Sequence, residues 1–104
     1  MRNDQDERPL ARPSVQVDNE RTRVTEWRFP PGAATGWHRH EYDYVVVPMT
    51  SGTLMMCNSN GESEALLESG KAYNRQAGVE HDVINPNDFE FVFVEVEIKA
   101  YGLD

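Results

Sequence analysis

Hydrophobic and polar residues alternate in short runs along most of this chain, and no segment keeps the period of an amphipathic helix. In the run 89–98, valines and an isoleucine alternate with phenylalanines and glutamates, as in a strand with two different faces. The run 21–29 alternates in the same way and places Trp27 and Phe29 on one face. The whole pattern predicts strands at residues 15–17, 21–29, 37–47, 52–59, 64–68, 72–74, 79–85 and 89–98.

Turn residues separate these runs and favour an all-β fold. Pro30 and Pro31 end the second strand, because proline donates no hydrogen bond to a sheet. Asn60 and Gly61 predict a two-residue hairpin, since both residue types tolerate a positive φ angle. Short strands at this turn spacing are typical of a sandwich or a small barrel.

The length of 104 residues fits one domain. Residues 1–13 are charged, contain two prolines and show no period, so we expect a flexible N-terminal arm there and a single domain over 14–104. No apolar leader opens the chain, and no window is apolar enough to cross a bilayer. We therefore expect a cytoplasmic protein.

The net charge of -8 argues against nucleic acid and anionic membranes as partners, because these are bound by clustered Lys and Arg, and the ten present here are scattered. The single cysteine, Cys57, excludes an internal disulfide and suits a reducing compartment. It lies in an apolar run, for which we expect a buried packing role.

The three histidines are the main candidates for chemistry. His38 and His40 are two residues apart, so on one strand both imidazoles point to the same side. Neutral imidazole binds Zn, Fe, Cu and Ni, and His81 offers a third ligand from another predicted strand. In a continuous strand over 37–47, Tyr42 and Tyr44 point inward with the histidines, whereas Glu41 and Asp43 point outward.

Two segments carry a resemblance to a known family. Residues 32–44 read GAATGWHRHEYDY, with Gly52 further on, and residues 70–85 read GKAYNRQAGVEHDVIN. They resemble the first and second motifs of the cupin superfamily, except that Gln76 replaces the usual proline. The resemblance implies a double-stranded β-helix, or jelly-roll barrel, with one divalent metal ion (Fe, Zn, Ni or Mn) on His38, His40 and His81.

The chain departs from the family pattern at the fourth metal ligand. Cupins usually place a glutamate there, and this sequence has Tyr44 or Val45, depending on the spacer. A phenol is a poor ligand for Zn(II) or Fe(II), so we expect a three-histidine centre. Such a centre keeps its positive charge and open positions, which suits an anionic small-molecule ligand. Tyr44 and Tyr42 are the candidate catalytic residues, through hydrogen bonds to a bound water or substrate.

The remaining candidates carry weaker signals. The aromatic residues Trp27, Phe29, Phe91 and Phe93 are expected in the core, and Arg28 and Arg75 are cations that could recognise a carboxylate. No general acid–base pair is evident, because Glu95 and Glu97 face inward only if their side of the last strand lines the barrel.

A closer resemblance links residues 37–48 and 77–85 to short bacterial cupins associated with β-alanine degradation. It implies a role in small amine or amino-acid metabolism and supplies no reaction. Our first hypothesis is a metalloenzyme, a dioxygenase or an isomerase or hydrolase, that acts on a small carboxylate or amino acid. The alternative is a non-catalytic cupin that binds a small ligand as a sensor or auxiliary protein. We also expect a homodimer, because Val45 and Val47 would leave an apolar outer face.

Overall fold

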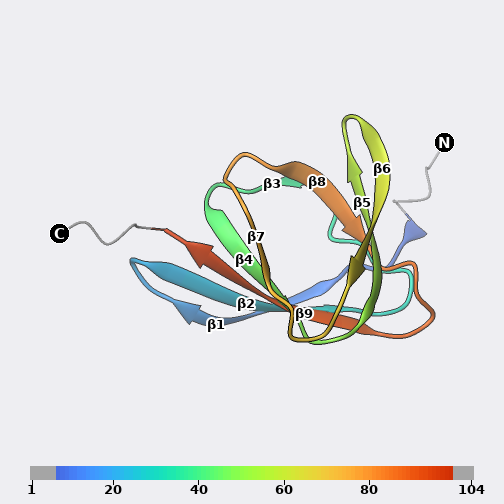
Figure 1. Cartoon of the computed structure of the whole chain (residues 1–104), viewed down its shortest axis with the longest axis horizontal. Helices are drawn as coiled ribbons and strands as arrows, with labels where there is room; N and C mark the ends of the chain where they lie inside the picture. Colours follow the sequence, from blue (N-terminus) through green and yellow to red (C-terminus); the bar gives the residue numbers. More distant parts are fainter. Residues whose placement is uncertain (1–6, 100–104) are drawn as a thin grey trace.

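The computed structural model describes residues 7–99 and is built from strands arranged in two antiparallel sheets (Figure 1). This confirms the all-β prediction and the jelly-roll architecture. The strands are β1 (Arg12–Asp18), β2 (Thr22–Phe29), β3 (His38–Arg39), β4 (Asp43–Pro48), β5 (Gly52–Asn58), β6 (Gly61–Leu67), β7 (Tyr73–Arg75), β8 (Glu80–Ile84) and β9 (Phe91–Ile98).

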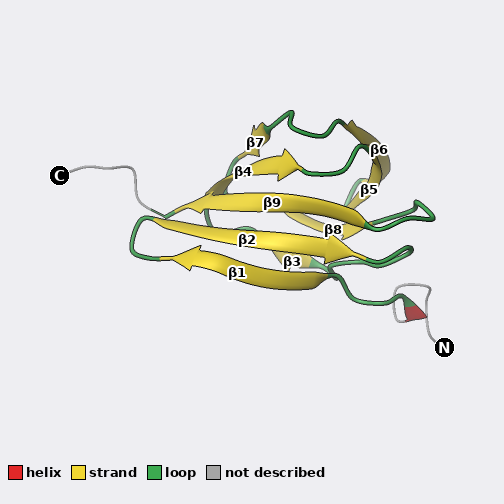
Figure 2. Cartoon of the chain, turned by 90° about the horizontal axis from the view of Figure 1, so that it is seen from below, coloured by secondary structure: helices red, strands yellow, loops and turns green. Residues whose placement is uncertain are grey.

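One sheet has the strand order β1-β2-β9-β4-β7, and the other has the order β3-β8-β5-β6. Figure 2 shows β1, β2 and β9 side by side, with β9 at the centre of the larger sheet. In this sheet Thr25 of β2 pairs with Glu95 of β9, and Glu95 pairs on its other side with Val46 of β4. Residues from several strands therefore form rows across one face.

The predicted strand over 37–47 is wrong as a single element. The chain leaves β3 after Arg39 and enters β4 at Asp43, and the two strands belong to different sheets. The corner between them is held by the His40 N–H, which donates to the Val79 carbonyl, and by the Gly78 N–H, which donates to the His40 carbonyl. Strict alternation therefore stops at His40.

The hydrophobic core lies between the sheets and is centred on Phe29, Leu54 and Phe91, which are fully buried. Trp27 packs against this core at the edge of a cavity. The expected core roles of the aromatic residues are confirmed for Phe29 and Phe91, whereas Trp27 and Phe93 line the cavity as well.

Three smaller expectations need correction or comment. The β5–β6 hairpin forms, but its two-residue loop is Ser59-Asn60, with Asn58 paired to Gly61. Cys57 is half-buried, because it lies beside Glu62 and not in the core. Of the expected arm at 1–13, residues 1–6 lie outside the described residues, and β1 already begins at Arg12.

Candidate metal centre and its cavity

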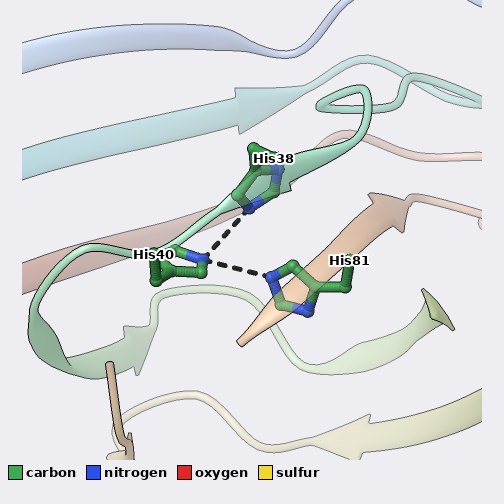
Figure 3. A group of neighbouring side chains, drawn as sticks. All are labelled: His38, His40 and His81. Carbon is green, nitrogen blue, oxygen red and sulfur yellow. Dashed lines mark hydrogen bonds between the residues drawn. The ribbon is translucent and has the colours of Figure 1, made fainter. Parts of the chain in front are cut away.

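The three histidines come together inside the barrel. His38 of β3 pairs across the sheet with His81 of β8, and His40 follows β3 directly. The His40 Nε2 atom lies 3.0 Å from His38 Nε2 and 3.1 Å from His81 Nε2 (Figure 3). All three side chains turn the same ring nitrogen toward one point. In the described part of the chain they form a group whose ligand atoms lie within 4.8 Å of one another.

The surrounding backbone fixes the ring of His38. Its Nδ1 lies 2.9 Å from the Gly36 carbonyl, which only accepts hydrogen bonds, so Nδ1 carries the proton and donates. The Nε2 atom of His38 is then left with a lone pair directed at the other two rings. A hydrogen bond from the remote nitrogen of a metal-binding histidine has this same orienting effect.

The segment before His38 is fixed in turn by a buried carboxylate. Asp82 is fully buried and accepts hydrogen bonds from the Gly36 N–H and the Thr35 hydroxyl. The Thr35 hydroxyl also accepts from the Val83 N–H on β8. This network joins the residues before β3 to β8 and holds both histidine-bearing strands in register.

Burial keeps His40 and His81 uncharged. Together with the electrostatic effect of His38, it lowers the pKa of His40 to about 3 and that of His81 to about 4. Both rings are therefore neutral at physiological pH, which is the protonation state that binds metals.

The donor set fits a bound cation. A ring nitrogen has one in-plane position, which holds either a hydrogen or a lone pair, so His40 Nε2 cannot make hydrogen bonds to both neighbours at once. A metal ion accepts all three lone pairs together and removes this conflict. Nitrogens bound at about 2.0–2.1 Å lie roughly 3.0–3.4 Å apart, close to the observed separations.

Tyr44 and Tyr42, the two predicted catalytic residues, lie in different places. Tyr44 is buried, and its ring stacks on His40 with the centroids 3.9 Å apart. Its hydroxyl has no hydrogen-bond partner among the described residues, and burial raises its pKa. Tyr42 does not line the cavity, whereas Glu41 does, so the predicted directions are wrong for these two residues. Tyr44 lines the cavity and Asp43 does not, as predicted. The Arg23 guanidinium lies 5.9 Å from the centroid of the Tyr42 ring.

The histidines face a cavity of about 620 Å³ between the two sheets. Its floor includes Phe93, Glu95 and Glu97 of β9, and each of these residues is buried. The glutamate side of β9 therefore faces inward. Sequence reasoning left the direction of this strand open and assigned no role to either glutamate. The shared face of Phe91 and Phe93 with the glutamates was the signal that could have decided it.

Charged residues around the cavity differ in their pairing. Arg23 donates two hydrogen bonds to Glu97, at 2.7 and 2.9 Å. Arg75 lines the cavity and lies over the Tyr73 ring, at 4.7 Å from its centroid, with no ion pair to a described carboxylate. Arg28 is exposed and pairs with surface glutamates, so it does not reach the cavity.

Comparison with known proteins gives a consistent result. A family model described as "Cupin domain" matches residues 25–97. The chain is 61% identical over 92 residues to the beta-alanine degradation protein BauB of Pseudomonas aeruginosa, and this match covers 88% of this chain and 97% of BauB.

Solved structures agree with the sequence comparison. A cupin domain from Bordetella pertussis Tohama I has 63% sequence identity and a TM-score of 0.88, with 89% of this chain and 97% of that one covered. A double-stranded β-helix protein from Klebsiella pneumoniae has a TM-score of 0.72 at 20% identity, covering 91% of this chain and 86% of that one. The second likeness shows the fold alone.

Proposed function

The chain belongs to the cupin family, and from this premise we propose that it binds one divalent metal ion on His38, His40 and His81. The observation that carries the proposal is the convergence of three imidazole nitrogens on one point, with separations that hydrogen bonds alone do not explain. Iron, zinc, nickel and manganese are the candidate ions.

We propose that this centre acts on a small metabolite of the carboxylate or amino-acid type. A bound divalent ion would supply Lewis acidity and, if it is iron, a site for oxygen chemistry. The chain's own residues do the rest: the histidines hold the ion at the cavity wall, and the buried residues of β9 line the floor beneath it. The name of the relative BauB supports this substrate class, because it links that protein to beta-alanine degradation.

The reaction proposed is that of a metal-dependent enzyme, either a dioxygenase or an isomerase or hydrolase. In this proposal Tyr44 is the catalytic candidate that lies at the histidines, because its ring stacks on His40 and its hydroxyl has no hydrogen-bond partner among the described residues. Tyr42 would act only from outside the cavity wall, which weakens its candidacy. Binding without turnover would instead favour a sensor or auxiliary protein.

Elemental analysis of the purified protein tests the metal site. We expect about one equivalent of a single transition metal, lost in a His38→Ala/His81→Ala variant purified in parallel. Arg39→Ala is the matched control, because Arg39 lies on the same strand between two ligands and is exposed. A wild-type protein that stays metal-free after anaerobic reconstitution would contradict the proposal.

We further propose that the protein is a cytoplasmic homodimer. Val15 and Val17 of the edge strand β1 are 58% and 41% exposed, and an apolar edge of this kind is often covered by a second copy. In the described residues, no helix is long and apolar enough to span a membrane. A monomeric mass by light scattering at micromolar concentration would contradict the dimer.

A further inference from the structure

Glu95 is a buried carboxyl group that makes no ion pair with a described residue. Its side chain lines the cavity, yet only 7% of the residue is exposed. The Trp27 indole N–H lies near the carboxyl group and favours its charged form, although no hydrogen bond of regular geometry joins the two side chains. A buried carboxylate with no balancing positive charge is costly, so a cationic ligand would stabilise it.

The surroundings of Glu95 suit a cation. The row across the sheet places Thr25 and Val46 beside it, and Tyr73 lies opposite Val46 on the next strand. Trp27 and Phe93 occupy the neighbouring row and also line the cavity. A carboxylate among aromatic side chains is a favourable site for an ammonium group, because the ring faces and the carboxylate both attract positive charge.

The histidine side of the same cavity suits an anion. Arg75 of β7 lines the cavity and pairs across the sheet with Tyr44, which stacks on His40. Tyr44, stacked on His40, lies one diagonal step along the sheet from Glu95, about 7–8 Å between Cα atoms. The cavity therefore has a positive side and a negative side separated by a few atoms of a small molecule.

We propose that Glu95 is the specificity-determining residue that binds the ammonium group of a short amino-carboxylate, whose carboxylate faces the histidines and Arg75. This inference rests on the proposed function only for the carboxylate end. The ammonium end depends on residues of β2, β7 and β9, and none of these residues belongs to the histidine cluster.

Three probes of similar length separate the two ends: 3-aminopropionate, propionate and propylamine. Binding is followed by ¹H–¹⁵N chemical shifts of the metal-loaded protein. The Trp27 indole N–H reports on the Glu95 side, and the indole of Trp37, which is 54% exposed, serves as the internal control. We expect 3-aminopropionate to bind about tenfold more tightly than propionate.

In Glu95→Gln, binding of 3-aminopropionate and propylamine should weaken about tenfold, while propionate binding changes less than about twofold. Glu64→Gln, at an exposed position on β6, is the matched control and should bind all three probes as the wild type does. Equal binding of 3-aminopropionate and propionate by the wild type would overturn the inference. So would unchanged amine binding in Glu95→Gln, or no amine binding at all.

The same titration in the His38→Ala/His81→Ala variant distinguishes the two proposals, because propylamine should bind there as it does to the wild type. If the wild type holds no metal but its propylamine binding depends on Glu95, the metal proposal fails and the ammonium site stands. If the wild type holds the metal but its propylamine binding does not depend on Glu95, the ammonium site fails and the metal proposal stands.

Discussion

Glu95 and Glu97 lie two residues apart on β9, face the same cavity and are equally buried, at 7% exposure each. They differ in what β2 places opposite them. Glu97 faces Arg23 and accepts two hydrogen bonds from its guanidinium, whereas Glu95 faces Thr25 and makes no ion pair with a described residue. One carboxylate is therefore neutralised within the protein, and we propose that the other is neutralised by a ligand.

The electrostatic consequences follow the pairing. The bidentate contact with Glu97 raises the pKa of Arg23. Burial, together with the negative charge of Glu97, raises the pKa of Glu95 to about 7. Two glutamates in equivalent positions on one strand thus have different electrostatic surroundings. Unpaired buried groups of this kind are more common at functional sites than elsewhere.

Replacing Arg23, the ion-pair partner of Glu97, should change the stability of the protein more than the other substitutions considered below. Arg23→Met leaves a second unpaired carboxylate beside Glu95. We expect the free energy of unfolding to fall by about 2–3 kcal/mol, below the full cost for a buried pair because Arg23 is partly exposed. Denaturant unfolding near neutral pH measures this difference.

The control for this variant is Arg21→Met, in the exposed turn before β2. A loss in Arg23→Met no greater than in Arg21→Met would show that the ion pair contributes nothing to stability. The distinction between the two glutamates would then rest on ligand binding alone.

Replacing Glu95 with the neutral residue glutamine should increase the free energy of unfolding, in contrast to the decrease expected for Arg23→Met. Its pKa is raised from 4.5 in the unfolded chain to about 7 in the folded protein, so the folded state holds the proton more tightly between these values. Stability therefore decreases as the pH rises through this window and levels off above it. Glu95→Gln should be more stable than the wild type by about 1–2 kcal/mol near pH 8, with little difference near pH 5.

Thermal unfolding at the two pH values checks this prediction, with Glu64→Gln as the exposed control. A variant that is less stable than the wild type near pH 8 would mean that Glu95 has a stabilising partner. A gain in stability, joined to lost amine binding, would identify a residue kept for function at the expense of stability.

The fold and the metal ligands could be predicted from the sequence because their signals are local. Period-two alternation indicated the strands, and the two cupin motifs placed His38, His40 and His81 at ligand positions. The structure then brought all three together without a change of residue. What alternation could not show is the corner after His40, because a change of sheet depends on pairing with distant strands.

The inward face of β9 could not be predicted for a different reason. Hydrophobicity alone favours the face with Val92, Val94 and Val96 as the buried one, yet the face with Glu95 lines the cavity. The cavity wall carries polar residues on this strand, so hydrophobicity alone does not identify its inward face. Only the pairing of β2 with β9 shows that Glu97 lies opposite the positive charge of Arg23, whereas Glu95 lies opposite the uncharged Thr25.

Replacing Tyr44, which lies beside the histidines, should have the smallest effect on stability. It compares a buried hydroxyl group with the buried carboxyl group of Glu95. Its hydroxyl is buried without a hydrogen-bond partner among the described residues, and unlike the Glu95 carboxyl group it lies directly beside the histidines. Tyr44→Phe should therefore leave the free energy of unfolding unchanged or raise it by up to about 1 kcal/mol, because an unpaired buried hydroxyl costs free energy. The ring that stacks on His40 is kept, so the metal content should not change. Denaturant unfolding and elemental analysis measure both quantities on one preparation.

A loss of stability above about 1 kcal/mol in Tyr44→Phe would reveal a hydrogen bond from the hydroxyl to water or ligand in the native protein. Unchanged stability joined to weaker ligand binding or turnover would instead assign the hydroxyl to function.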